Sequence, residues 1–345
     1  WRRTDRAVAN LERLRARYTK EEAKGLFVYL EHHGGELEGV SLELLGAARA
    51  FAPGEGVRGI LLGGKGRGLA EEAIRRGADE VFMVEDRRLE DYATRPYTRA
   101  LATLVERLKP DVLLMGATQN GCDLAGRLAV RLQTGLTAHV SALEVEKETG
   151  HLVGWVPGFG GGIAAAVKCP DRRPQMFTVR PGVLAALPRD DTRTGRIRGE
   201  TVEFGPEDFS AEIVKKSARA GVDITRAERL VAVGRGTEGN MGPVRELAEA
   251  LRAEIGGTRV AVDEGWIARE RMVGQTGCAV RPKVAIVCGV SGASQFTVGI
   301  EHAGLVVAIN NDPDALIFER SDVCVVEDVS RILPPLTALA KGEPA

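Results

Sequence analysis

Short apolar runs alternate with amphipathic helical patterns over much of the chain. Apolar runs of about four to eight residues bounded by glycine or polar residues are typical of buried strands, and apolar residues three or four positions apart predict helices. This β-α-β alternation predicts a parallel, doubly wound sheet. The expected order is strand 25–32, helix 40–52, strand 57–63, helix 68–77, strand 80–86, helix 98–109, strand 111–117 and helix 123–132.

Closely spaced strand patterns follow, with no helical pattern between them. Strands that are joined by short turns pair in antiparallel fashion, so we expect an antiparallel addition to the first domain. The ranges are 141–148, 151–157, 163–169 and 175–180.

The periodicity breaks at Leu187–Ser210, a charged stretch, and a second α/β pattern begins after it. The last segment reads as a terminal helix that its prolines, Pro334 and Pro335, interrupt. The expected order is strand 229–234, helix 244–256, strands 259–263 and 284–289, short helix 294–303, strands 305–310 and 323–328, and helix 330–342.

The predicted fold class is therefore α/β, with two doubly wound, mostly parallel-sheet domains. We expect residues 1–24 to form an added N-terminal helix with Asp5 as its cap, and residues 25–205 to form domain I. Residues 206–228 are predicted to be a linker, and residues 229–345 to form domain II.

Composition narrows the class of protein. The net charge of −1, from 47 basic and 48 acidic residues, gives no support for binding to nucleic acid or to a membrane surface. No apolar run approaches the ~20 residues that span a bilayer, and the charged start lacks the apolar core of a secretory signal. The five cysteines contain no CxxC pair, so we expect no metal site and a reducing, cytoplasmic location.

Three glycine-rich turns follow predicted strands. Gly63–Gly68 contains a lysine but lacks the P-loop spacing, and we interpret it as an ordinary turn. Val231–Asn240 places Arg235 between glycines at a strand end. In Ala285–Phe296, "AIVCGVSGASQF", small residues lead from a strand into a predicted helix, whose first amides would face an anion. A phosphate is the natural ligand for this turn.

Further polar residues end the neighbouring strands, in "VGQTG", "AINND" and "VVEDV". Strand ends of a doubly wound sheet lie along one edge, so one elongated ligand, such as a dinucleotide, could contact all of them. The residues that would surround it are Arg235, Arg259, Thr276, Ser291, Asn310 and Asp328.

No nucleophile and base stand together in a known arrangement, and none of the five histidines belongs to an HExxH motif. We therefore predict no catalytic side chain and a cofactor that supplies the chemistry.

Five ordered motifs in residues 229–340 resemble the FAD-binding domain of the electron-transfer flavoprotein α subunit family: "GRG", "VGQTG", "GVSGASQF", "AINNDPDALIF" and "SDVCVVEDV". The resemblance continues upstream, for example in "RPQMFTVRPGV", and covers about residues 25–340.

The resemblance implies an αβ heterodimer. Domain II would hold FAD and swivel as a unit, while domain I, nucleotide-binding-like in fold but without a nucleotide, would pack on the β subunit. The flavin would take electrons from an acyl-CoA or other dehydrogenase and pass them to a redox partner. Either β carries AMP and one FAD shuttles electrons, or β carries a second FAD, oxidises NADH and bifurcates electrons, with ferredoxin or flavodoxin as an acceptor. The sequence leaves both variants open.

The resemblance also implies roles for single residues. Arg235 lies near the flavin, Arg259 over its ring, and Thr276 near flavin N5 or O4, while the segment from Ser291 holds the diphosphate and ribityl chain. Asn310 and Asp328 are assigned to the adenosine half, and Val329 lies beside them. The whole set is Arg235, Thr258, Arg259, Val273, Gly274, Gln275, Thr276, Ser291, Gly292, Ala293, Ser294, Gln295, Phe296, Asn310, Asp328 and Val329.

Phe296 departs from the family, which often has histidine at this position. A phenyl ring cannot donate a hydrogen bond to flavin O2, so we expect the anionic one-electron-reduced flavin to be less stabilised than in relatives with the histidine. The alternative is that Phe296 only packs there while Arg259 supplies the charge.

Two other classes of function fit the sequence less well. An NAD-dependent dehydrogenase needs a GxGxxG turn, a following acidic residue and a catalytic acid or base, and these do not occur together here. A nucleotide-sensing module without a redox role would bind adenine nucleotides but no flavin.

Overall fold

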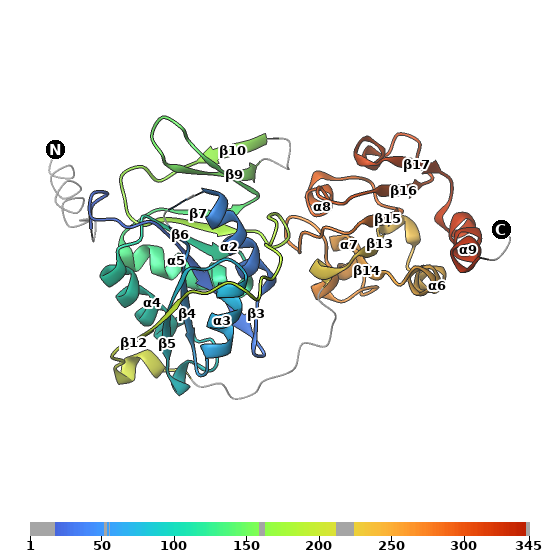
Figure 1. Ribbon diagram of the computed structural model, residues 1–345. Coiled ribbons are helices and arrows are strands. Elements are labelled where there is room, and N and C mark those ends of the chain that lie inside the picture. Colours follow the sequence, from blue (N-terminus) through green and yellow to red (C-terminus); the bar gives the residue numbers. More distant parts are fainter. Residues whose placement is uncertain (1–17, 52–53, 55, 159–162, 212–223, 343–345) are drawn as a thin grey trace. The chain divides into compact units, whose positions relative to one another are not determined.

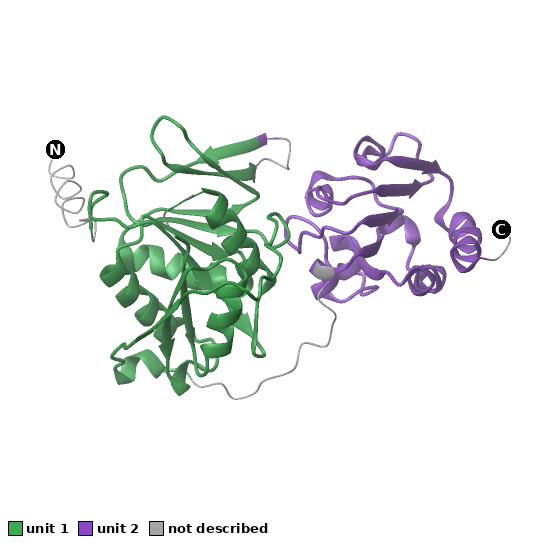
Figure 2. Ribbon diagram, in the orientation of Figure 1, with its two compact units in different colours: residues 1–157, 164–216 green, residues 158–163, 217–345 purple. Residues whose placement is uncertain are grey.

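The computed structural model describes residues 18–51, 54, 56–158, 163–211 and 224–342 (Figure 1). The chain divides into two compact units, residues 1–157 with 164–216 and residues 158–163 with 217–345 (Figure 2). Most of the predicted N-terminal helix, with Asp5, and much of the predicted linker lie outside the described residues. Each unit is described by itself.

Unit 1 contains a seven-stranded parallel sheet in the order β12-β5-β4-β1-β6-β11-β7. Helices α4 and α5 pack together against one face, where their leucines meet Phe27, Tyr29 and Ile60 in a buried core. The strands are β1 (Leu26–Leu30), β4 (Arg58–Gly63), β5 (Glu80–Glu85), β6 (Val112–Gly116), β7 (Leu136–Val140), β11 (Gln175–Val179) and β12 (Arg196–Glu200), and the helices are α2 (Gly39–Phe51), α3 (Arg67–Arg75), α4 (Thr94–Leu108) and α5 (Gln119–Leu132).

The predicted antiparallel addition is confirmed where residues 142–145 pair with residues 152–158, and it is wrong for the last of the four predicted strands. β8 (Ala142–Val145), β9 (Leu152–Gly158) and β10 (Ile163–Val167) form a separate small sheet, in which β8 and β9 are antiparallel. β11, however, lies in the main sheet between β6 and β7 and pairs in parallel with both. All five of its residues are buried, as expected for a strand with neighbours on both sides.

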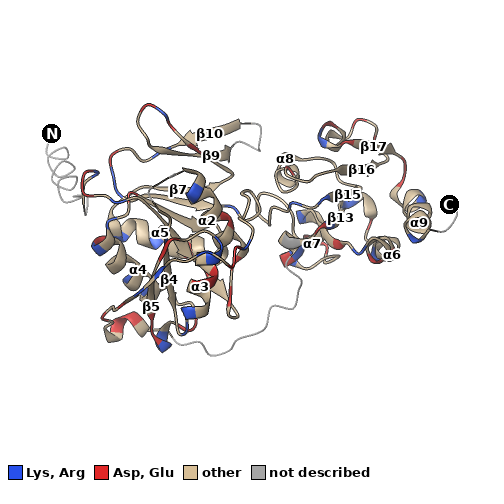
Figure 3. Cartoon of the chain, in the orientation of Figure 1, with Lys and Arg blue, Asp and Glu red and all other residues tan. Residues whose placement is uncertain are grey.

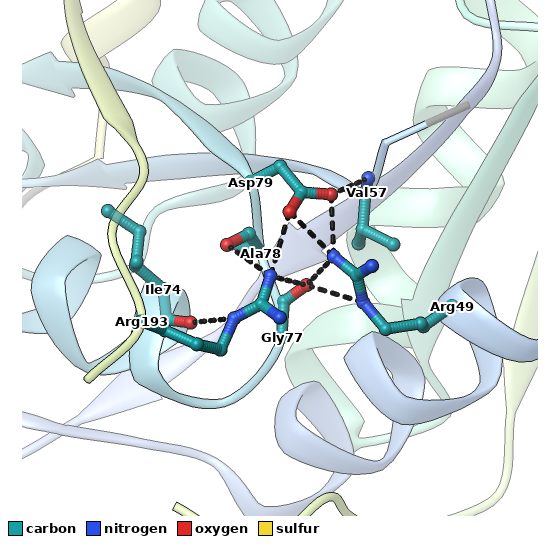
Figure 4. Close-up of polar contacts among 7 residues, drawn as sticks. All are labelled: Arg49, Val57, Ile74, Gly77, Ala78, Asp79 and Arg193. Carbon is teal, nitrogen blue, oxygen red and sulfur yellow. Dashed lines mark hydrogen bonds and ion pairs between the residues drawn. The ribbon is translucent and has the colours of Figure 1, made fainter. Parts of the chain in front are cut away.

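The sequence pattern does not predict β12 (Arg196–Glu200), because this strand has no apolar periodicity. Ionic contacts rather than burial hold much of it in place. It pairs in parallel with β5 at the sheet edge. Just before it, Arg193 donates to the Asp79 carboxylate at 2.7 Å, and Arg49 from α2 donates to the same carboxylate at 2.6 Å (Figure 4). The Val57 amide adds a third bond at 2.8 Å. Asp79 therefore joins three separate segments at the start of β5.

Unit 2 contains a five-stranded parallel sheet in the order β14-β13-β15-β16-β17. One face is covered by α6 and α9, and the other carries a second core that includes Phe296, Ile300 and Ile317. The strands are β13 (Arg229–Val233), β14 (Glu254–Gly257), β15 (Val284–Cys288), β16 (Val306–Asn310) and β17 (Val323–Val326), and the helices are α6 (Met241–Leu251), α7 (Arg259–Asp263), α8 (Ser294–Thr297) and α9 (Val329–Lys341). Both sheets together confirm the predicted fold class.

Three local predictions in unit 2 are wrong. Residues 259–263 form helix α7 instead of a strand, because β14 already occupies the sheet edge and the chain turns at Thr258. The predicted helix 244–256 is too long. Arg252, with φ of 50°, ends α6, and the residues that follow form strand β14. Helix α9 continues through Pro334 and Pro335, since the Asp328 cap and buried residues such as Leu333 hold it.

Basic and acidic residues are interspersed over the described parts of both units (Figure 3). No helix in the described ranges has both the length and the apolar character to cross a bilayer. Surface charge therefore does not mark a site.

Candidate functional site: a pocket at the carboxyl edge of the second sheet

A pocket of about 780 Å³ opens at the carboxyl edge of the unit 2 sheet. Its walls come from the segments that follow β13, β14, β15 and β16. Open parallel sheets bind ligands at this edge, and the volume falls in the range of about 300–1,000 Å³ that is typical of small-molecule sites. The topology thus brings the predicted strand-end motifs to one cavity.

Glycines allow the turn after β15 to pass close to its neighbours. Gly289 has φ of +61°, and a Cβ on it would lie 2.6 Å from the backbone of Gly236. Gly292 has φ of +88°, and its Cβ would lie 2.0 Å from the Ile317 nitrogen. Side chains at either position would push the loops apart, so these two glycines fix the shape of one wall.

The same turn presents free donors. The amides of Gly292, Ala293, Ser294 and Gln295 donate no hydrogen bond to another residue of the described chain. Amides at the start of a helix lack partners within the helix and can bind an anion. Ala293 and Gln295 line the pocket, so this part of it suits a phosphate or diphosphate.

A second part of the pocket lining is apolar and contains one buried polar atom that has no partner in the described ranges. Met272, Val273 and Phe296 are buried and contribute to the lining. Thr258 lines the pocket, and its buried hydroxyl oxygen has no hydrogen-bond partner among the described residues. A buried polar atom without a partner costs free energy, so its position fits a bound group that supplies the missing bond.

Two arginines bring positive charge to the pocket. The Arg259 side chain is 74% exposed and its Nε lies 3.3 Å from Asp263 Oδ2. Arg235, at the end of β13, forms no ion pair with another residue in the described ranges. Exposed guanidinium groups can turn toward an anionic ligand, because a weak surface pair does not hold them.

Near β16, the side chains of the predicted residues form hydrogen bonds within the protein. Asn310 is 8% exposed; its Nδ2 donates to the Val290 carbonyl at 2.9 Å, and its Oδ1 accepts from the Asp312 amide at 3.0 Å. Asp328 lies outside the lining and caps α9, and the hydrogen bonds from Ser330 hold the pKa of its carboxyl below the usual value. Asn311, Asp312 and Asp314 also line the pocket here, and Asp312 Oδ1 accepts a hydrogen bond from the Asp314 amide at 3.0 Å.

The structure thus gathers ten of the sixteen predicted residues around the pocket: Arg235, Thr258, Arg259, Val273, Thr276, Ser291, Ala293, Gln295, Phe296 and Asn310. Six others are not part of the lining: Gly274, Gln275, Gly292, Ser294, Asp328 and Val329.

Several lining residues were not predicted. Asn311, Asp312 and Asp314 could have been found from the run "NNDPD" directly after a strand, whereas Glu238, Met272 and Leu316 carry no local signal in the sequence. The full unpredicted set is Gly236, Glu238, Val260, Met272, Gly289, Val290, Asn311, Asp312, Asp314, Ala315 and Leu316.

Two family descriptions match the chain. Residues 26–204 match the electron transfer flavoprotein domain, and residues 223–301 match the electron transfer flavoprotein FAD-binding domain. The chain therefore belongs to the electron-transfer flavoprotein α subunit family, as the sequence motifs indicated.

Curated relatives cover nearly the whole chain. The electron transfer flavoprotein subunit alpha of Thermoanaerobacterium thermosaccharolyticum is 41% identical over 91% of this chain and 96% of its own length. Protein FixB of Clostridium saccharobutylicum is 40% identical over 92% of this chain and 96% of its own length. The LctC subunit of the lactate dehydrogenase (NAD(+),ferredoxin) of Acetobacterium woodii is 36% identical, covering 92% of this chain and 77% of that protein.

Proposed function

We propose that this chain is the α subunit of a heterodimeric electron-transfer flavoprotein and holds FAD in the unit 2 pocket. The observation that carries the proposal is that one pocket combines amide donors with an apolar lining. The amides of residues 292–295 suit a diphosphate, and the apolar lining beside the Thr258 hydroxyl suits a flavin ring; neither these amides nor this hydroxyl has a partner among the residues that the structure describes. Bound FAD would supply the redox chemistry.

The residues of the chain bind and orient the cofactor in this proposal. Val273 and Phe296 exclude water from the ring, Thr258 and Thr276 offer hydroxyls to its polar edge, and Arg259 brings positive charge. A cation beside a flavin favours its anionic reduced state. Asn310 acts indirectly, because its side chain joins the turn after β15 to the loop after β16.

The wider assembly is also part of the proposal. Unit 1 would pack on a β subunit, and the flavin would pass electrons between a dehydrogenase and a second redox partner. A cytoplasmic location fits the five free cysteines of the chain.

Within this function we favour an electron-bifurcating complex that uses NADH, with a second FAD in the β subunit. The support is the name of one relative, a subunit of a lactate dehydrogenase that is coupled to NAD(+) and ferredoxin. The alternative is a simple carrier with a single FAD and AMP in β. A relative named only as a subunit alpha is compatible with either assembly.

A cofactor count tests these proposals. The chain is copurified with its β subunit, the complex is denatured, and released FAD and AMP are quantified per heterodimer. Two FAD and no AMP support bifurcation, whereas one FAD and one AMP support the simple carrier. A complex that takes up no FAD, even on reconstitution, refutes the assignment of the pocket.

A further inference from the structure

The loop of residues 273–277 is fixed at its base and at its tip. At the base, the Cys278 amide donates to the Met272 carbonyl at 2.9 Å, and the Gly274 amide donates to the Cys278 carbonyl at 3.0 Å. At the tip, the Gln275 amide donates to the Gln295 carbonyl of α8 at 2.6 Å. The loop that borders the apolar end of the pocket is thus attached to the segment that carries the free amides.

Gly299 lies behind this loop and does not line the pocket. Its carbonyl accepts a hydrogen bond from the Val280 amide at 2.8 Å. A Cβ at this position would lie 2.4 Å from the Gly274 nitrogen, 2.7 Å from the Gly274 Cα and 2.8 Å from a Val273 methyl. The first two are backbone atoms, which cannot rotate out of the way.

We propose that Gly299 is a positioning residue for the cofactor. Because it has no side chain, the 273–277 loop packs directly against its backbone, and this contact sets the position of the loop at the pocket. The inference rests on the proposed binding of FAD in this pocket. A Cβ must be at least 3.0 Å from its neighbours, so alanine would displace the loop by about 0.6 Å from the 2.4 Å contact. Binding groups must be held within about 0.5 Å of their working geometry, so this displacement disturbs Val273 and Thr276.

The displacement acts on one end of the pocket. The close contacts of Gly299 are with Val273 and Gly274, and none of them is with the turn at residues 291–295. The direct displacement therefore falls on the 273–277 loop, and it reaches the diphosphate end only through the single hydrogen bond from Gln275 to Gln295. A general loss of stability would affect both ends alike.

Gly299→Ala isolates this contact. Gly299 does not have a left-handed backbone, so alanine adds no backbone strain, in contrast to Gly274, whose φ is +132°. Gly242→Ala, in α6, is the matched control, because a Cβ there would meet only Asn240 Oδ1, at 3.8 Å. Both changes add one methyl group to the same unit.

Each variant is copurified with the β subunit and titrated with FAD, and with ADP as a probe of the diphosphate end. For Gly299→Ala we expect the FAD dissociation constant to rise about tenfold or more, the absorption bands of the bound flavin to shift, and ADP affinity to stay within about twofold. Gly242→Ala should match the wild type in all three. Wild-type FAD affinity and spectrum in Gly299→Ala would overturn the inference, as would an equal loss of ADP binding.

Failure of the proposed function looks different, because the wild-type complex itself would then bind no FAD. If Gly299→Ala does not accumulate as folded complex, hydrogen exchange in the wild type decides. The Gln275 and Val280 amides, which both donate to the segment of residues 294–299, should gain protection together when FAD is added. Independent exchange of these two amides would overturn the inference.

Discussion

Replacing Thr258 with valine should have opposite effects on the FAD-free and the FAD-bound protein. The Thr258 hydroxyl is buried at the pocket wall and has no hydrogen-bond partner within the described part of the chain. In the unfolded chain water would satisfy this hydroxyl, so folding without a ligand carries the cost of an unpaired polar atom, about 1–3 kcal/mol. Valine has nearly the same shape and avoids that cost.

We therefore expect Thr258→Val to stabilise the FAD-free complex by about 1 kcal/mol or more, which raises the melting temperature by about 2–4 °C per kcal/mol. The same change removes a hydrogen bond to bound FAD that is worth about 1 kcal/mol. The FAD dissociation constant should accordingly rise about fivefold to tenfold. FAD would protect the variant against heat less than it protects the wild type.

Differential scanning calorimetry of the copurified complex, with and without FAD, measures both effects. Thr237→Val is the control, because the Thr237 hydroxyl is also buried but donates to the Gly234 carbonyl at 2.8 Å. That variant should lose about 1 kcal/mol of stability in both states. A Thr258→Val complex that is less stable without FAD, or that binds FAD as the wild type does, would refute the reasoning.

Three further changes have defined outcomes. Gly292→Ala should abolish retention of FAD during purification, because its Cβ would lie 2.0 Å from the Ile317 nitrogen in a left-handed backbone; a yellow complex with full FAD content would contradict this. Phe296→His should raise the flavin reduction potential in a reductive titration. The variant should also lose about 1–3 kcal/mol of folding stability, because a polar ring is buried in this 4% exposed position. An unchanged potential would mean that Phe296 only packs there. Asp79→Asn should destabilise unit 1 by about 1–2 kcal/mol, since two arginines and the Val57 amide lose a charged acceptor that is partly open to water. Burial would raise the pKa of Asp79, but the bonds from Val57, Arg49 and Arg193 outweigh it and lower that pKa, so this stability should be present above about pH 4 and lost as the pH falls below it; equal acid sensitivity of the variant and the wild type in urea unfolding would count against it.

The sequence by itself determined the fold class and about half of the pocket lining. The alternation of apolar runs with helical patterns was sufficient to predict two parallel sheets, because burial on both faces demands near-continuous apolar strands. The glycine turn at residues 289–292 was also visible, since glycine marks places where the backbone passes close to a neighbour.

The tertiary structure alone decided the position of several segments. β11 lies in the main sheet, where it pairs with β6 on one side and β7 on the other. The sequence "QMFTV" alone would suit this position and a strand of an antiparallel hairpin equally well. β12 depends on Asp79 and its two arginines, which come from three distant parts of the chain (Figure 4). Residues 259–263 have a strand-like composition but form a helix, because the neighbouring β14 already ends the sheet.

The same distinction holds for single site residues. The sequence could assign polar groups to the edge of a sheet, but it could not show that the fold uses the Asn310 amide and the Asp328 carboxylate internally while the Thr258 hydroxyl is left unpaired. The physical reason is that a hydrogen bond depends on the distance between two atoms, and for groups far apart in the chain only the packed structure sets that distance.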